Sequence, residues 1–285
     1  MINLKINRFV DKLFQYVGVA VTLFGLVMLA IFIGDILIKG LGRIDWDFLT
    51  SLPSRRASKA GILTAWAGTA WIFFLTALIS IPLGISAGIF LQEYGKKSRL
   101  ASIIEVNIAN LAGIPSIIYG LLGLEIFVRI MNLGGSILTG ALTLSLLVLP
   151  VIIVATREAL KAVPNSLREA SYGMGATKWQ TIWHQVLPAA AGGVVTGIIL
   201  ALSRAVGETA PLIVIGALAY VPFVPTSPMD EFTVLPLQIF NWISRPQHEF
   251  MINGAAAIII LLLITFVMNG MAIYLRNRWQ KKVKW

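Results

Sequence analysis

Residues 135–155 read GSILTGALTLSLLVLPVIIVA, a run without a single charged side chain. A helix that crosses a lipid bilayer needs about 20 consecutive and mainly apolar residues. Five other stretches reach this length, at about 14–38, 62–92, 104–128, 190–219 and 253–275. The sequence therefore predicts an all-α integral membrane protein. Its six transmembrane helices are expected to form a single domain over residues 1–285, with a core at about 60–275.

The composition supports this class of protein. Of the 285 residues, 57% are hydrophobic and 13% are charged, whereas a soluble domain carries roughly 25% charged residues. The net charge of +10 would favour a nucleic-acid partner in a soluble protein, but here it reflects the Lys and Arg of cytoplasmic loops. We expect contact with membrane lipid and none with nucleic acid. Because the chain has no cysteine and only two histidines, no disulfide and no metal site is expected.

The orientation in the membrane follows from the same basic residues. If the N-terminus is cytoplasmic, 15 of the 23 Lys and Arg residues fall on the cytoplasmic side, seven fall outside, and Arg204 lies within a span. This bias predicts a multi-pass protein of the plasma (bacterial inner) membrane with both termini in the cytoplasm. The apolar run from Leu13 to Ile38 has no small-residue cleavage site and is interpreted as a retained signal anchor. The first external loop, with five basic residues, fits this orientation least well.

Two connections are too long to be turns. One, at about 220–252, is external and rich in proline. The other, at about 156–188, is cytoplasmic and has the pattern of a helix, a break and a second helix. The residues that predict this pattern are Pro164 with Asn165 or Ser166 as a nearby cap, Gly173 and Gly175 for a sharp turn, Thr177 as the second cap, and Pro188 as the limit of the second helix. Such a helix pair can seat in a groove of a soluble partner.

The same connection resembles the docking loop of ABC-importer permeases. In that family a Glu-Ala-Ala start is followed by a glycine six positions after the Glu and later by a Leu-Pro pair. The matching residues are Glu169, Ala170, Gly175, Leu187 and Pro188, and the departures are Ser171 and Gln185. The resemblance implies a type I importer permease fold whose loop docks a nucleotide-binding subunit through Glu169, Ala170, Gly173 and Gly175. An amphipathic interfacial loop with coincidental spacing is the alternative.

No nucleotide-binding loop is present in the sequence itself. The only Gly-Lys pair, Gly95-Lys96, is followed by Lys97, and Phe90 stands where a P-loop needs its first glycine. We therefore expect no enzymatic activity and no cofactor in this chain. The resemblance implies that ATP and magnesium are bound by partner ATPase subunits.

The fifth predicted span contains two charged residues, Arg204 and Glu208. Arg204 lies roughly 22 Å along a helix from Ala189, where an Arg costs about 2.5 to 3.5 kcal/mol on insertion scales and should face a cavity or a counter-charge. The spacing of four places Glu208 on the same helix face. Two interpretations are open: the pair only locks helices together, or it belongs to a transport path.

A transport path for an oxyanion needs cationic groups and hydrogen-bond donors. Arg204, Thr209 and nearby backbone amides can supply them, and Glu208 would keep Arg204 from holding the anion too tightly. In the third span, Gly113-Ile114-Pro115 predicts a break, and Ser116 just after it can line the same path. A kink without any role in transport explains this motif as well.

Other features of the spans are interpreted as structural. Gly193, Gly197 and Ala201 recur every four residues, a spacing that predicts a close-packed helix face. Two charge pairs lie near the outer ends of spans, where interfacial pairing costs little: Asp35 with Lys39, and Glu125 with Arg129.

Two stretches narrow the resemblance to phosphate permeases: the run 204–212, RAVGETAPL, and the run 113–120, GIPSIIYG. The triplet Ala210-Pro211-Leu212 and the run 235–242, LPLQIFNW, are similar to the A-type (PstA) family. This resemblance implies phosphate as the cargo. It also implies a C-type phosphate permease, two ATP-binding subunits and an external phosphate-binding protein as partners. A permease for molybdate or sulfate is the nearest alternative, and a secondary anion transporter is a more distant one.

Overall fold

The computed structural model describes residues 4–95, 99–217 and 220–280 of the chain. Its elements are helices, and the one strand-like pairing within these residues is an isolated bridge between Ser136 and Glu231. Among the described residues, five helices are long and apolar enough to cross a membrane, and a bent helix pair makes six if it counts as one span. The prediction of an all-α membrane protein is confirmed. Lys96, Lys97 and the lysines beyond residue 280, which entered the orientation argument, lie outside the described residues.

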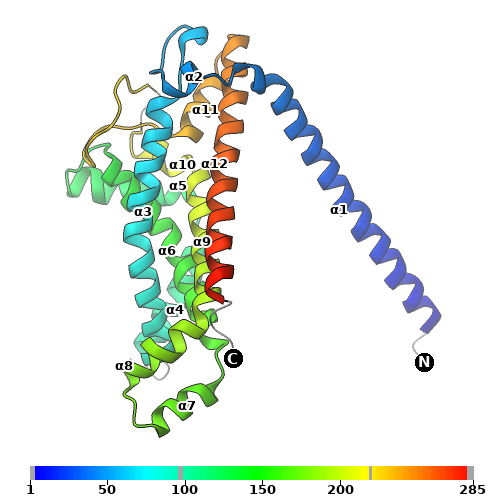
Figure 1. Ribbon diagram of the computed structural model, residues 1–285, viewed down its shortest axis with the longest axis vertical. Coiled ribbons are helices and arrows are strands. Elements are labelled where there is room, and N and C mark those ends of the chain that lie inside the picture. Colours follow the sequence, from blue (N-terminus) through cyan, green and yellow to red (C-terminus); the bar gives the residue numbers. More distant parts are fainter. Residues whose placement is uncertain (1–3, 96–98, 218–219, 281–285) are drawn as a thin grey trace.

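The long helices make up most of the molecule, and all but the first run side by side along its long axis (Figure 1). They are α1 (Leu4–Gly40), α3 (Leu63–Ile89), α6 (Ile137–Lys161), α9 (Leu187–Gly207) and α12 (His248–Gln280), and the bent pair is α4 (Arg99–Ala112) with α5 (Ser116–Gly123). At one end, called the α2 end, lie η1 (Leu41–Arg43), α2 (Trp46–Thr50), η2 (Ala57–Lys59) and α11 (Leu235–Ile243), with α10 (Ala210–Val214) below them. At the opposite end, called the α7 end, lie α7 (Asn165–Gly173) and α8 (Lys178–Thr181). Three π-helical turns extend α3, α5 and α8: η3 (Phe90–Tyr94), η4 (Leu124–Ile130) and η5 (Ile182–Val186).

Helix α6 forms the centre of the bundle. Its most apolar window is 61% buried, against 28% in α3 and 33% in the α9 and α12 spans. Small residues let its neighbours approach closely: on α9, a methyl group added at Gly193 would lie 2.7 Å from that of Ala159, and one at Gly197 would overlap Ala155. The predicted close-packed face of the fifth span is therefore confirmed.

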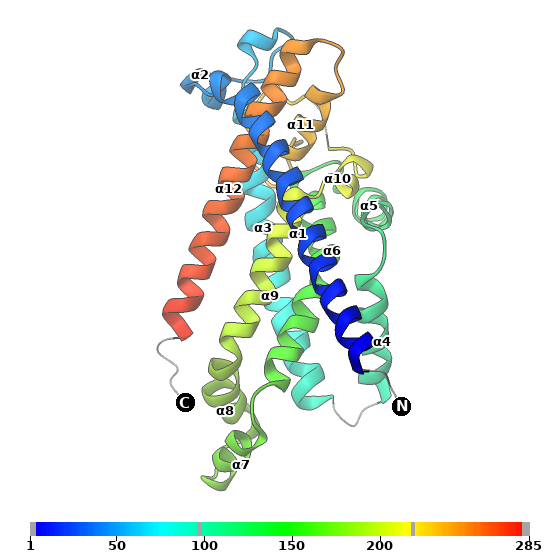
Figure 2. The ribbon, with the colours of Figure 1, turned by 90° about the vertical axis from the view of Figure 1, so that its right-hand side faces the viewer.

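The third span breaks where the sequence predicts. Helix α4 ends at Ala112, α5 begins at Ser116, and their axes differ by 109°. Figure 2 looks nearly along α5, whereas α4 runs along the long axis of the molecule. Pro115, which has no backbone N–H, occupies the N-cap of α5. The hydroxyl of Tyr119 donates to the Leu111 carbonyl at 2.8 Å and so satisfies a group near the end of α4.

Helix α1, which contains the predicted span 14–38, departs from the bundle (Figures 1 and 2). Its apolar window has no buried residues, and its last residue, Gly40, lies against Ala255 and Ala256 of α12. An apolar helix of this length is stable where lipid or another membrane protein covers it.

Arg43 organises the α2 end. Its Nε donates to Asn253 Oδ1 at 3.1 Å, and its Nη2 donates to the carbonyls of Ser58 and Ala60 at 3.2 Å each. Its Nη1 forms an ion pair with Asp45 at 3.1 Å. One charge of the basic first loop is thus compensated within the chain, and the loop is tied to the start of α12.

The two predicted charge pairs at the span ends are confirmed. Lys39 Nζ lies 2.6 Å from Asp35 Oδ2, and Arg129 Nη1 lies 2.8 Å from Glu125 Oε2. All four side chains are more than half exposed, so the pairs contribute little to stability.

The fifth span differs from the predicted range 190–219. The helix runs continuously over Lys178–Gly207, and the chain then turns into the short α10. Pro188 does not limit the preceding helix as predicted. It lies in the first turn of α9, directly after the wide turn η5, where the backbone register already shifts and a residue without N–H breaks no regular ladder.

Candidate functional site

Arg204 and Glu208 meet at the end of α9. Arg204 Nε donates to Glu208 Oε1 at 3.2 Å. The helix ends at Gly207, and Glu208 itself has an extended backbone (ψ 128°). The predicted pairing is confirmed, although the carboxylate lies beyond the last helical residue. The Glu208 side chain is 17% exposed and that of Arg204 is 48% exposed, so the arginine is the more accessible member of the pair.

The Nη atoms of Arg204 have no hydrogen-bond acceptor within the part of the chain that the structure describes. Glu208, in contrast, borders a narrow internal cavity of about 10 Å³ together with Thr69 and Thr76 of α3. A cavity of this size holds about one water molecule. This cavity is therefore too small to admit anything much larger than water.

The break in the third span lies beside the same stretch of α9. Tyr119 of α5 packs in one apolar cluster with Ala201 and Ala205, and Ala205 follows Arg204 directly. Ser116 begins α5 and is half-buried, and no hydrogen bond joins it to Arg204 among the described residues. The Thr209 hydroxyl faces the carbonyl of Gly207 at 3.5 Å. The structure thus brings Arg204 and Glu208 into contact and leaves Ser116 and Thr209 as neighbours of the break points.

The connection at the α7 end forms two helices joined by a turn, as predicted. Gly175 has φ +84°, a left-handed conformation that side chains rarely adopt, whereas Gly173 is the last residue of α7. Thr177 caps α8 in a capping box with Gln180. The predicted side-chain cap of α7 by Asn165 or Ser166 is wrong, because Pro164 occupies the N-cap and no side chain caps it.

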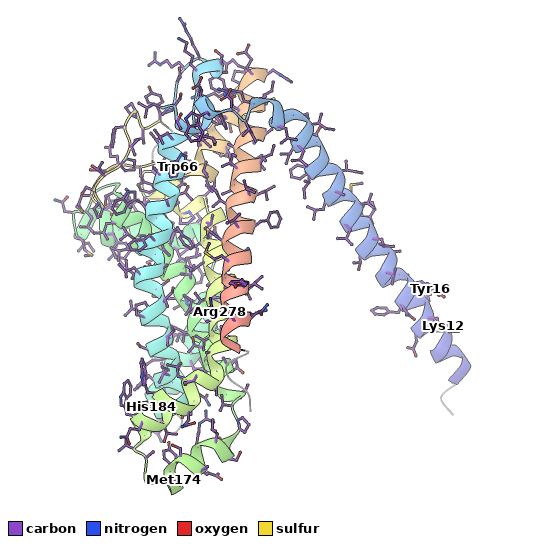
Figure 3. All side chains as sticks on the ribbon, viewed as in Figure 1. Lys12, Tyr16, Trp66, Met174, His184 and Arg278 are labelled. Atoms are coloured by element: carbon purple, nitrogen blue, oxygen red, sulfur yellow. The ribbon has the colours of Figure 1, made fainter. Side chains whose placement is uncertain are left out.

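The surface of this helix pair is open. Glu169 and Ala170 are exposed, and Met174 at the tip is 88% exposed. Figure 3 shows Met174 at the extreme of the molecule, beyond His184. A shallow hollow between the two helices is lined by Ser171, Met174, Gly175, Ala176, Gln180, His184 and Gln185. The hydroxyls of Ser171 and Thr181 lie 2.8 Å apart, so the serine that departs from the expected alanine joins the two helices.

Two residues of this region were missed by sequence reasoning. Arg168, counted only as a cytoplasmic charge, is 6% exposed and forms a 2.7 Å ion pair with Glu93 at the end of α3. A carboxylate that directly follows an apolar span was the available signal for Glu93. Within the described residues, no three His, Asp or Glu side chains gather as metal ligands.

A bundle that combines an ion pair beside two broken helices with a projecting helix pair at one end has the features of a transporter's membrane subunit. Residues 80–281 match the family described as "Binding-protein-dependent transport system inner membrane component". The chain belongs to this family, in the group that contains the PstA phosphate permeases, and is a multi-pass inner-membrane protein.

Several relatives match most of the chain. "Phosphate transport system permease protein PstA" of Yersinia pestis is 34% identical over 263 residues, which cover 92% of this chain and 88% of that protein. The PstA of Xylella fastidiosa (strain Temecula1) is 31% identical over 279 residues, 96% of each chain. "Probable ABC transporter permease protein YqgI" of Bacillus subtilis is 33% identical over 280 residues, 91% of this chain and 93% of that one.

Solved structures share the fold. A chain of a bacterial alginate ABC transporter matches with a TM-score of 0.70 and 15% identity, over 96% of both chains. A chain of the MetNI methionine ABC transporter matches with a TM-score of 0.61 and 19% identity, over 76% of this chain and 95% of that one. The fold is therefore that of type I ABC importer permeases.

Proposed function

We propose that this chain is a permease subunit of an ATP-driven importer of inorganic phosphate. The relation to PstA over about nine-tenths of the chain carries the proposal. The anion path would form between this chain and a homologous C-type permease. Two ATPase subunits would bind ATP and magnesium, and an external phosphate-binding protein would dock at the connection 220–252. Transport would be alternating access, in which ATP binding biases the equilibrium between inward-open and outward-open states.

The geometry of Arg204 supports an anion as cargo. Its Nε is held by Glu208, its side chain is about half exposed, and its Nη atoms have no acceptor among the described residues, an arrangement that leaves the Nη atoms of the guanidinium for phosphate oxygens. Glu208 also reduces the net charge of the site and would speed release of the anion. Thr209 and Ser116 would add hydroxyl donors as the break points move.

The α7 end would face the cytoplasm, where Glu169, Ala170, Gly173 and Gly175 would contact an ATPase. In this orientation both termini would lie in the cytoplasm. A protease-cleavable tag at either end should be cut only after the membrane is permeabilised, and cleavage in intact cells would overturn the orientation.

The substrate is tested by phosphate uptake into proteoliposomes that contain the whole transporter. Uptake should require ATP inside and should resist excess sulfate or molybdate outside. Arg204→Gln should abolish it, while Arg129→Gln, which removes the cation of an exposed i,i+4 pair, should leave it intact. Equal competition by molybdate or sulfate would refute the substrate. Uptake that follows an ion gradient without ATP would refute the class of transporter.

A further inference from the structure

At the α7 end of the molecule, the extension of α3 (η3) contacts both helices of the projecting loop, α7 and α8. Arg168 of α7 donates from Nη2 to Glu93 Oε1 at 2.7 Å and from Nε to Oε2 at 3.4 Å. The next residue of η3, Tyr94, lies under Lys178 of α8, with Nζ 4.3 Å from the ring centroid. Two adjacent residues of the α3 extension therefore contact α7 and α8 separately.

Arg168 also joins a third helix. Its Nη1 donates to the Val163 carbonyl at 2.8 Å, and its Nη2 donates to the Leu160 carbonyl at 2.9 Å. Leu160 belongs to the last turn of α6, where carbonyls lack helical partners and attract cations. One guanidinium thus connects the ends of α3, α6 and α7.

Burial makes this connection different from the other ion pairs nearby. The side chains of Arg168 and Glu93 are 8% and 5% exposed, whereas Lys161 and Glu158 are 61% and 53% exposed. Exposed pairs separate at little cost, because water replaces the partner. Separation of a buried pair leaves an uncompensated charge in the protein, which is strongly unfavourable. Displacement of α7 relative to α3 is therefore resisted far more than rotation at an exposed pair would be.

We propose that Glu93 and Arg168 are a positioning pair that makes the docking loop and the ends of α3 and α6 move as one body. The proposal rests on the proposed function, in which an ATPase moves this loop. The covalent route from the loop leads through the continuous helix Lys178–Gly207 to Arg204. The Glu93–Arg168 route leads through α3, whose Thr69 and Thr76 border the cavity at Glu208. Both walls of the site then receive the same movement.

Without the pair, α7 keeps the hydroxyl contact of Ser171 with Thr181 of α8 and the apolar packing of Leu167, but it loses its charged contact with the extension of α3. The left-handed turn at Gly175 and the segment around Pro164 are the two points at which its backbone joins other helices. When the loop moves, α7 could then rotate about these two points, and α3 would not move with it.

The test compares anion transported per ATP hydrolysed in proteoliposomes that contain the complete transporter. Glu93→Gln and Arg168→Gln should each lower this ratio by about tenfold, a coupling change of ordinary size, while ATP hydrolysis continues. The matched control is Glu105→Gln, which removes a 2.6 Å ion pair with Arg157 between α4 and α6 and involves no residue of α7 or α8. Glu93→Asp should retain most of the wild-type ratio. If both pair variants keep the ratio of the control, the proposal is overturned.

A second measurement applies if the variants fail to assemble. The chain has no cysteine, so spin labels can be placed at the exposed positions Phe90 of η3 and Tyr172 of α7 with the pair intact. Their separation should stay constant between the nucleotide-free and ATP-trapped transporter, and a change of more than about 2 Å, the size of an allosteric helix shift, would overturn the proposal. This distance needs no phosphate. A transporter that carries another anion would thus refute the proposed substrate alone, whereas a chain that binds no ATPase would refute both.

Discussion

The contact between α9 and α6 should tolerate no added methyl group at Gly197. A Cβ built there overlaps the methyl of Ala155, and extra atoms in a well-packed site cost about 1 to 3 kcal/mol. Gly270 of α12 offers a matched control, because a Cβ there meets no atom within 4 Å. Both Gly→Ala changes gain up to about 1 kcal/mol of helix propensity. Gly197→Ala should therefore be less stable than Gly270→Ala by about 1 to 3 kcal/mol.

Thermal unfolding of the detergent-solubilised chain measures this difference. At roughly 2 to 4 °C per kcal/mol for a chain of this size, the two variants should melt several degrees apart. Ala155→Gly combined with Gly197→Ala should restore the lost stability, since it removes the overlapping methyl and isolates the pairwise term. Equal melting of Gly197→Ala and Gly270→Ala would show that α9 does not approach α6 this closely.

Three further predictions concern the docking loop, the cap of α8 and the turn at Asp230. Gly175→Ala forces a side chain into a left-handed backbone at a cost of about 1 to 2 kcal/mol. Gly175→Ala and Glu169→Ala, each as a single variant, should still insert into the membrane but should uncouple ATP hydrolysis from uptake. Normal coupling in both variants would remove the docking role. Thr177→Ala deletes a capping box, which should cost about 1 kcal/mol and increase limited proteolysis of the loop, and wild-type protection would contradict the cap's contribution. The backbone N–H groups of Thr226 and Ser227 donate to Asp230 and lower the pKa of its carboxyl. The turn should therefore be stable above the ordinary pKa of Asp and should loosen as the pH falls below that value. In Asp230→Asn, the protection of this turn against hydrogen exchange should no longer change in this pH range.

The sequence alone predicted that the chain has several membrane spans, and it predicted the break in the third span, because both features follow from local chemistry. Hydrophobic length identifies a membrane helix without knowledge of its neighbours. Pro115, which lacks a backbone donor, predicts its break equally well. The Arg204–Glu208 contact was also predictable, since a spacing of four in a helix and the cost of a lone buried charge both favour it.

The connections that depend on tertiary packing were not predictable. Glu93 and Arg168 lie 75 positions apart, and nothing in their local sequence relates them. Pro188 was expected to limit a helix, but a π-helical turn just before it let the helix continue. Residue types alone do not specify a π-helical turn of this kind.

The continuous helix Lys178–Gly207 connects the docking loop directly to the Arg204–Glu208 site. If Pro188 ended the helix, loop and site would be separate bodies joined by a flexible point, and movement of the loop would not determine the position of Arg204. A single rigid helix instead has Thr177 as its cap at one end and Arg204 in its last turn at the other. Rotation of the cap end therefore displaces the guanidinium, while Glu208, just beyond the helix, is free to follow or to separate. In the proposed anion path, release of the anion would depend on whether this 3.2 Å contact persists when the helix tilts.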